Sequence, residues 1–188
     1  MVTIPRCASL TSGTFSWLLN PSSSGPAFDQ LFLEHFNQVL SYELRLVGDL
    51  AVAHKLAEET YSELARYYRK GRPPTEPKAL LYLLATARAR DQIRHGEKQT
   101  LWQRLFSRPE EPKVEFTDEH TTGLTSDTSQ RALSTLEFSS QVVLLLHDYC
   151  GLTYDEVARA AGIGRSSVAK DLDTARREFK QAYDYIKF

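Results

Sequence analysis

The C-terminal part of the chain contains polar side chains spaced as on one face of a helix. At 100° per residue, one side of this segment holds Ser166, Lys170, Asp173 and Arg177, with Ser167 and Thr174 next to them. Hydroxyl groups can hydrogen-bond base edges and phosphates, and Lys and Arg can reach both. Because the side chains are shortest near the start of the helix, that end can approach a groove closely. The pattern predicts contact with DNA.

Two flanking patterns predict the elements that hold this face in place. The opposite side of the same helix is apolar, with Val168, Leu172, Ala175 and Phe179 at helical spacing. Upstream, Thr153-Tyr-Asp-Glu156 has the spacing of a capping box, which predicts a helix that runs to Ala161. Gly162-Ile163-Gly164 then supplies a tight turn. Together they predict a helix-turn-helix whose recognition helix begins near Arg165.

Helical periodicity also extends through most of the preceding chain. A second capping-box spacing, Ser134-Thr-Leu-Glu137, predicts a helix start near Ser134 with an apolar body at 142–146. In the first half, apolar residues recur at helical spacing from Phe28 and again from Val52, and a third helix can begin near Pro77 after the Gly71-Arg72-Pro73-Pro74 break. The third helix is basic in its second half. No strand-like alternation is long enough to predict a sheet.

Composition divides the chain into four segments. Residues 1–27 are rich in Ser, Thr, Gly and Pro and predict a disordered arm, and residues 28–107 form a first helical domain. Residues 108–129 contain six acidic and two basic residues and predict an acidic flexible linker, and residues 130–188 form the helix-turn-helix domain. The expected fold class is therefore all-α, with two small helical domains joined by that linker.

Overall composition excludes several classes of protein. The 23 Lys and Arg against 24 Asp and Glu give the 188-residue chain a net charge of -1, so it does not coat nucleic acid by charge alone. Two cysteines, Cys7 and Cys150, are too few for a disulfide framework and favour a reducing cytoplasm. No apolar run is long enough to cross a membrane, so no membrane insertion is expected.

Three further motifs could indicate other chemistry. Ser167-Val-Ala-Lys170 matches the Ser-x-x-Lys pair of penicillin-binding hydrolases, but the companion Ser-Asp-Asn and Lys-Thr-Gly elements are absent. His147-x-x-Cys150 has no second pair at zinc-site spacing, so core packing or solvent exposure is the simpler interpretation. Gly162-x-Gly164 lacks the remaining residues of a phosphate cradle. The sequence therefore predicts no catalytic residues, no metal and no cofactor.

The C-terminal sequence resembles the extracytoplasmic-function group of bacterial RNA polymerase sigma factors. In that family an apolar helix leads to G-L-T/S-Y-x-E-I/V-A and then to G-x-S-x-x-S/T-V-x at the turn into the recognition helix. The matching positions are Gly151, Leu152, Thr153, Tyr154, Glu156, Val157, Ala158, Gly162, Ser167 and Val168, followed by the Ala175-Arg176 pair.

The first half resembles the same family with more departures. ALLYLLATARARDQIR, residues 79–94, is similar to A-W-L-F-x-I-A-R-N-x-x-I-D-x-L-R, and AHKLAEETY, residues 53–61, is similar to D-A-E-D-L-V-Q-E-x-F. The resemblance as a whole covers nearly all of residues 28–180. The departures are Leu80, Thr86, Ala87 and Arg90 in the first segment, and His54 and Lys55 in the second.

The resemblance implies a sigma factor that is not itself an enzyme and that directs core polymerase to specific promoters. The sigma factor would contact the β′ clamp and the β flap of the polymerase. The residues of this chain that would bind the clamp are Leu56, Glu58, Glu59 and Tyr61. The implied contacts to the minus-ten promoter element are Lys70, Arg72, Lys78, Arg88, Arg90 and Arg94. The implied contacts to the minus-thirty-five element are Arg165, Ser166, Ser167, Lys170, Thr174 and Arg177.

The resemblance also implies an anti-sigma factor as a further partner. Two other functional classes stay open from the residues alone. A stand-alone helix-turn-helix transcriptional regulator would explain the C-terminal half and would bind a palindromic site as a dimer without polymerase. A protein-binding module would use the last helix to fill a partner's groove and would show no selectivity for DNA.

Overall fold

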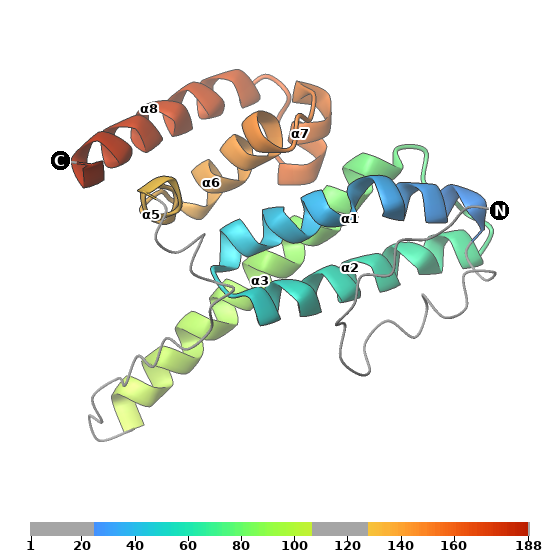
Figure 1. Ribbon diagram of the computed structural model, residues 1–188, viewed down its shortest axis with the longest axis horizontal. Coiled ribbons are helices and arrows are strands. Elements are labelled where there is room, and N and C mark those ends of the chain that lie inside the picture. Colours follow the sequence, from blue (N-terminus) through green and yellow to red (C-terminus); the bar gives the residue numbers. More distant parts are fainter. Residues whose placement is uncertain (1–24, 107–127, 188) are drawn as a thin grey trace.

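The computed structural model describes residues 25–106 and 128–187. All regular elements in these ranges are helices, so the predicted all-α fold is confirmed. The predicted arm and acidic linker lie almost entirely outside the described residues. The helices fall into two groups along the chain, a long antiparallel pair with a third long helix, and a set of shorter helices closed by α8 (Figure 1).

The first group contains α1 (Pro26–Val47), α2 (Leu50–Arg69) and α3 (Pro77–Phe106). Gly48, in a left-handed conformation with φ 74°, ends α1, and the Asp49 side chain caps α2 by accepting a hydrogen bond of 2.8 Å from the amide of Val52. The first half of α3 packs against both helices, whereas its second half extends beyond them (Figure 1).

Aromatic side chains fill the core between these three helices. Phe28, Tyr42, Tyr61 and Tyr82 are almost completely buried. The rings of Phe32 and Tyr61 meet edge to face with their centroids 4.9 Å apart, which joins α1 to α2. Aromatic rings bury a large apolar area and prefer this geometry, so they supply much of the cohesion of a small three-helix core.

A chain of hydrogen bonds explains one departure from the family pattern, Thr86. This residue is 1% exposed, and its hydroxyl donates to the carbonyl oxygen of Tyr82 at 2.7 Å. The Thr86 proton is thereby used, so the Tyr42 hydroxyl, 2.7 Å away, donates to Thr86 Oγ1. Thr86 thus satisfies a buried tyrosine where a long cationic side chain would not fit.

The second group contains α5 (Thr128–Ser134), α6 (Phe138–Leu144), a π-helical turn (Leu145–Tyr149), α7 (Tyr154–Ala161) and α8 (Val168–Lys187). In the π-helical turn the amide of Cys150 donates to the carbonyl of Leu145 at 2.8 Å, five residues back. The core includes Leu146, Leu152, Val157, Val168 and Leu172, each no more than 1% exposed.

The predicted capping box at Ser134 is wrong. Ser134 is the last residue of α5, and its hydroxyl donates to the carbonyl of Arg131 at 2.8 Å. Glu137 is the N-cap of α6 but makes no side-chain capping bond. Leu136 is 7% exposed, so the chain breaks between the two short helices to bury this side chain, an effect that local spacing does not report.

The two groups of helices pack directly against each other, mainly through α3 and α7. Arg159 pairs with Glu76, and Lys78 Nζ lies 3.9 Å from Glu156 Oε1. Further in, the Tyr82 hydroxyl donates to Gln38 Oε1 at 2.9 Å, and Gln38 Nε2 donates to the Cys150 carbonyl oxygen at 3.3 Å. Burial raises the pKa of the Cys150 thiol to about 12, so it stays protonated at neutral pH.

None of the helices in the described ranges has the length and apolar character needed to span a membrane.

Candidate nucleic-acid interface

The predicted capping box at the start of α7 is confirmed and sets the position of the helix-turn-helix. The Thr153 hydroxyl accepts a hydrogen bond of 3.4 Å from the amide of Glu156, and the Glu156 carboxylate accepts one of 2.8 Å from the amide of Thr153. Burial alone would raise the pKa of Glu156, but hydrogen bonds from the Thr153 amide and hydroxyl to its carboxylate, together with nearby Lys78, lower it, so the carboxylate stays ionised. At the other end, Gly162 ends α7 in a left-handed conformation with φ 70°.

Replacement of Thr153 by alanine is expected to lower the free energy of unfolding of the C-terminal domain by about 1 kcal/mol, the typical cost of losing an N-cap side chain. Urea denaturation followed by circular dichroism measures this change. Ser139→Ala is the matched control, because Ser139 is an exposed hydroxyl that caps no helix. Equal stability of the Thr153→Ala chain and the wild type would show that the box contributes nothing.

The helix after the turn begins later than predicted. Residues 165–167 form a turn, and α8 begins at Val168. Ser167 closes this turn, since its hydroxyl donates to the carbonyl of Gly164 at 2.8 Å and its carbonyl accepts from the amide of Asp171 at 2.9 Å. Ser166 is exposed beside it. The two serines therefore lie at the N-terminal entry of α8, where amide groups point outward.

The polar face of α8 is solvent-exposed along its outer side. Lys170, Asp173 and Arg177 are exposed and, with Arg176, line a shallow hollow on the surface. Arg177 stays close to its own helix, with Nη2 donating to Thr174 Oγ1 at 3.3 Å. The opposite face is buried through Val168, Leu172 and Ala175, as predicted. The helix therefore exposes the cationic groups of Lys170 and Arg177 to solvent, while its opposite face is packed in the core.

Arg165 has a different environment from the other members of this set. Its Nε donates to Asp155 Oδ1, and its guanidinium lies over the Tyr154 ring, 5.1 Å from the centroid. Both partners belong to α7. Arg165 therefore braces the turn in this structure, although more than half of its side chain, 56%, remains exposed.

The pair Arg176–Asp148 was not predicted from the sequence. Arg176 donates from Nε and Nη2 to the two oxygens of Asp148, a bidentate pair between α8 and the π-helical turn. These bonds lower the pKa of Asp148 below its usual value. The partners are 28 residues apart, and helical spacing contains no signal for them. Arg176 thus fixes α8 and is not one of its free cations.

Of the residues predicted to contact the minus-ten element, some are exposed to solvent and others contact side chains of the same chain. Lys70, Arg72 and Arg94 are exposed. Lys78 faces Glu156 across the domain boundary, and the Arg90 guanidinium lies over the Phe138 ring, 5.5 Å from its centroid. Arg88 contacts Glu59 and Glu63 of α2. Half of the predicted set is therefore held by other parts of the same chain.

The residues predicted to bind the polymerase clamp differ in their exposure to solvent. Leu56 and Tyr61 are buried, at 4% and 0% exposed, and pack in the core of the first group. Glu58 and Glu59 lie at the surface of α2. Partial desolvation, followed by the neighbouring Glu59 charge, raises the pKa of Glu58. The surface of α2 is thus acidic around Glu58 and Glu59, and the two apolar residues pack beneath it.

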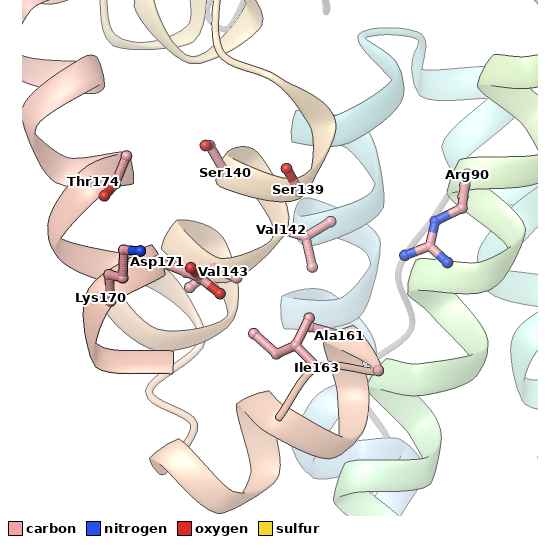
Figure 2. Close-up of a pocket in the computed structure, with 11 residues that line it drawn as sticks. Arg90, Ser139, Ser140, Val142, Val143, Ala161, Ile163, Lys170, Asp171 and Thr174 are labelled. Carbon is pink, nitrogen blue, oxygen red and sulfur yellow. The ribbon is translucent and has the colours of Figure 1, made fainter. Parts of the chain in front are cut away.

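A cavity of about 570 Å³ lies where the two predicted DNA-binding sets meet (Figure 2). Val142, Val143 and Ile163 contribute its apolar lining. Arg90 of α3 stands on one side, and Lys170 and Thr174 of α8 stand on the other (Figure 2). In this structure, residues predicted for two separate promoter elements therefore line a single small cavity.

The remaining candidate motifs are explained by local structure. Ser167 donates within its own turn, and the Lys170 side chain faces solvent and the cavity. His147 Nδ1 lies 2.8 Å from the carbonyl oxygen of Leu152, which ties the end of the π-helical turn to the next loop. In the described ranges, no three side chains of His, Cys, Asp or Glu are grouped as metal ligands would be.

Comparison with known proteins agrees with this geometry. Residues 129–179 match the family described as sigma-70, region 4. The chain is 24% identical over 164 residues to RNA polymerase sigma factor YlaC of Bacillus subtilis (strain 168), and the match covers 82% of this chain and 91% of that protein.

A solved structure has the same fold. It is the sigma factor RpoE of Bartonella quintana in complex with the anti-sigma factor NepR, with a TM-score of 0.66 and 15% identity. The match covers 84% of this chain and 97% of that one. Residues 129–179 thus form a sigma-70 region 4 domain, and over most of its length the chain is similar to a sigma factor.

Proposed function

We propose that this protein is a sigma factor that brings core RNA polymerase to a particular set of promoters. The region 4 domain binds the minus-thirty-five element through α8, and the first helical domain binds the minus-ten element and the polymerase clamp. The observation that carries this proposal is the exposed polar face of α8, with Lys170 and Arg177 at the surface, within a matched sigma-70 region 4 domain. Whole-chain similarity to a sigma factor supports the role of the other domain.

The domain boundaries in this proposal are 28–107 and 130–188, with residues 108–129 as the connection. The protein acts in the cytoplasm, where it meets the polymerase β′ clamp and β flap. An anti-sigma factor is a further proposed partner, because the relative of known structure was solved in complex with one.

Run-off transcription tests the proposal directly. Bacterial core polymerase is incubated with and without this protein on sheared DNA from the source organism, and the 5′ ends of the transcripts are mapped. New, discrete start sites that share sequence motifs are expected only when the protein is present. No new starts, together with tight dimeric binding to DNA without polymerase, would contradict the sigma-factor proposal and favour a stand-alone regulator.

The compact arrangement of the two domains cannot engage both promoter elements of one site. The elements are centred about 25 base pairs apart, or about 85 Å along duplex DNA at about 3.4 Å per base pair. Arg90 and Lys170, by contrast, line the same cavity of about 570 Å³. The contacts between α3 and α7 must therefore separate before the promoter is bound, and they hold the free protein closed.

Energy transfer between dyes measures this separation. Dyes are placed at Arg66 on α2 and Lys180 on α8, both exposed, in a chain with Cys7→Ser and Cys150→Ala. Transfer is expected to be efficient in the free protein and to decrease strongly when core polymerase and a mapped promoter fragment are added. A control pair at Glu34 and Arg66 lies within one domain and should not change. Unchanged transfer in the first pair would contradict the opening.

A further inference from the structure

Arg88 of α3 connects the two surfaces that the proposed function assigns to the first domain. Its Nη1 lies 3.0 Å from Glu59 Oε2, and its Nη2 contacts Glu63 Oε2. Glu59 belongs to the proposed polymerase-docking surface, and Arg88 belongs to the proposed minus-ten surface. While its single positive charge is paired with these two carboxylates, the guanidinium has no charge left to neutralise a DNA phosphate. The two surfaces therefore compete for the same side chain.

The contact is accessible from outside. The Arg88 side chain is 24% exposed, whereas the side chains of Glu59 and Glu63 are 43% and 37% exposed. The two carboxylates are one helical turn apart on α2, so they face the same direction. A basic surface that docks on α2 can therefore approach both carboxylates without first unfolding the domain.

The inner side of the same cluster is incompletely satisfied. Arg88 Nε is buried without a hydrogen-bond partner among the described residues, because its two Nη groups contact separate carboxylates and do not form a bidentate fork with one of them. Below it, Glu43 of α1 is 0% exposed and accepts one bond of 3.1 Å from Thr60, while its Oε2 has no partner in the described ranges. A buried polar group that lacks a hydrogen-bond partner raises the free energy of the folded state. The Arg88 side chain can therefore leave Glu59 and Glu63 for another partner more easily than if all its hydrogen bonds were made.

We propose that Arg88 couples docking on α2 to nucleic-acid binding on α3. In the free protein Glu59 and Glu63 hold Arg88. When a basic surface binds these carboxylates, the guanidinium is released and binds a phosphate of the opened minus-ten strand. By thermodynamic linkage, nucleic acid that binds Arg88 strengthens docking on α2 by the same factor. The inference rests on the proposed function and assigns Arg88 a switching role within it.

The first test uses the free protein and a fluorescein-labelled 20-nucleotide oligo(dT), with fluorescence anisotropy measured over a range of NaCl concentrations. Glu63→Gln partly releases Arg88 and is expected to tighten binding about 3- to 10-fold and to steepen the dependence of log K on log salt by about 0.7, the value for one additional phosphate contact on a single strand. Adding Arg88→Gln is expected to abolish both changes, whereas adding Arg88→Lys retains the steeper slope because the charge is kept.

Asp184→Asn is the matched control, because it removes one exposed carboxylate near the far end of α8. It is expected to leave affinity and slope unchanged. If Glu63→Gln with Arg88→Gln kept the full gain of Glu63→Gln alone, the gain would be general electrostatics and the inference would be wrong. Circular dichroism melting of each variant, including the charge-conserving Arg88→Lys chain, identifies any that fail to fold.

The second test measures the affinity of the labelled protein for core polymerase with and without the same unlabelled oligonucleotide. The oligonucleotide is expected to increase polymerase affinity several-fold for the wild type and much less for Arg88→Gln. Failure of the wild type to bind core polymerase at all would contradict the proposed function. Normal polymerase binding with the same oligonucleotide effect in both chains would leave the proposed function intact and overturn the coupling.

Discussion

Replacing Lys170 and Arg177 together by alanine is expected to reduce transcription from the selected promoters by at least about 30-fold, since each lost contact to a base edge or phosphate costs about 1–3 kcal/mol. Both side chains are exposed on the outer face of α8, and among the described residues neither pairs with a carboxylate that would hold it away from DNA. Run-off transcription on a mapped promoter measures the loss, and affinity for core polymerase should change less than about 2-fold, since rim charges contribute little to a large interface.

The control for this prediction removes the same number of charges elsewhere in the domain. Arg131→Ala with Lys187→Ala takes two exposed cations from α5 and from the end of α8. If that control reduced transcription as strongly as the Lys170 and Arg177 pair, the effect would come from net charge and not from the recognition face. A large loss confined to the recognition-face variant would assign sequence recognition to α8.

The second large effect is expected in the pH dependence of stability, through Glu43. Burial is the main cause that raises the pKa of this carboxyl to about 8, and its bond from Thr60 and the charge of Arg88 oppose the shift only in part. In the unfolded chain the pKa is near the ordinary value of 4.5. Between these values the folded protein holds a proton that the unfolded chain has lost.

The sign of the effect follows from linkage. Because the folded state binds more protons in this window, the contribution of Glu43 makes the free energy of unfolding decrease as pH rises from about 4.5 to about 8, by at most about 1.4 kcal/mol for each pH unit. Below the window both states are protonated, and above it both are ionised, so the contribution becomes constant. The contribution of Glu43 to stability is therefore smallest at the alkaline end of the window.

Glu43→Gln replaces the neutral acid by a neutral amide of the same shape and is expected to remove this pH dependence. The variant should exceed the wild type in stability by a few kcal/mol at pH 8.5 and approach it at pH 4.5. Urea denaturation at the two pH values measures the difference, with the exposed Glu34→Gln as the matched control. A parallel pH dependence in wild type and Glu43→Gln would refute the buried, protonated state of this residue.

The local features of the C-terminal domain could be predicted well from the sequence. The Thr153 capping box, the left-handed Gly162 and the buried row Val168, Leu172 and Ala175 all depend on residues within one or two helical turns of each other. Such patterns can be read because the helical repeat itself brings these side chains together. The same reasoning was wrong at Ser134, where burial of Leu136 determines where the helix breaks.

The state of the candidate site residues could not be predicted in the same way. Arg88 is 25 and 29 residues from its partners, and Lys78 is held by a carboxylate of the other domain. Helical spacing identifies which side chains are cationic and which face they share. It does not report whether the packing of α2 or α7 has already occupied them, because that depends on how separate helices meet.

The π-helical turn at Leu145–Tyr149 has a consequence for how the family can vary. A π-helical turn is equivalent to one residue inserted into an α-helix, and each such residue rotates everything after it by about 100°. Here the rotation directs the Cys150 carbonyl toward Gln38 and Asp148 toward Arg176. A chain with a regular helix at this position would be one residue shorter and would lose the Gln38 contact between the domains and the Asp148–Arg176 pair within the second domain. A single-codon deletion is therefore enough to weaken the packing between the domains and the anchoring of α8 together.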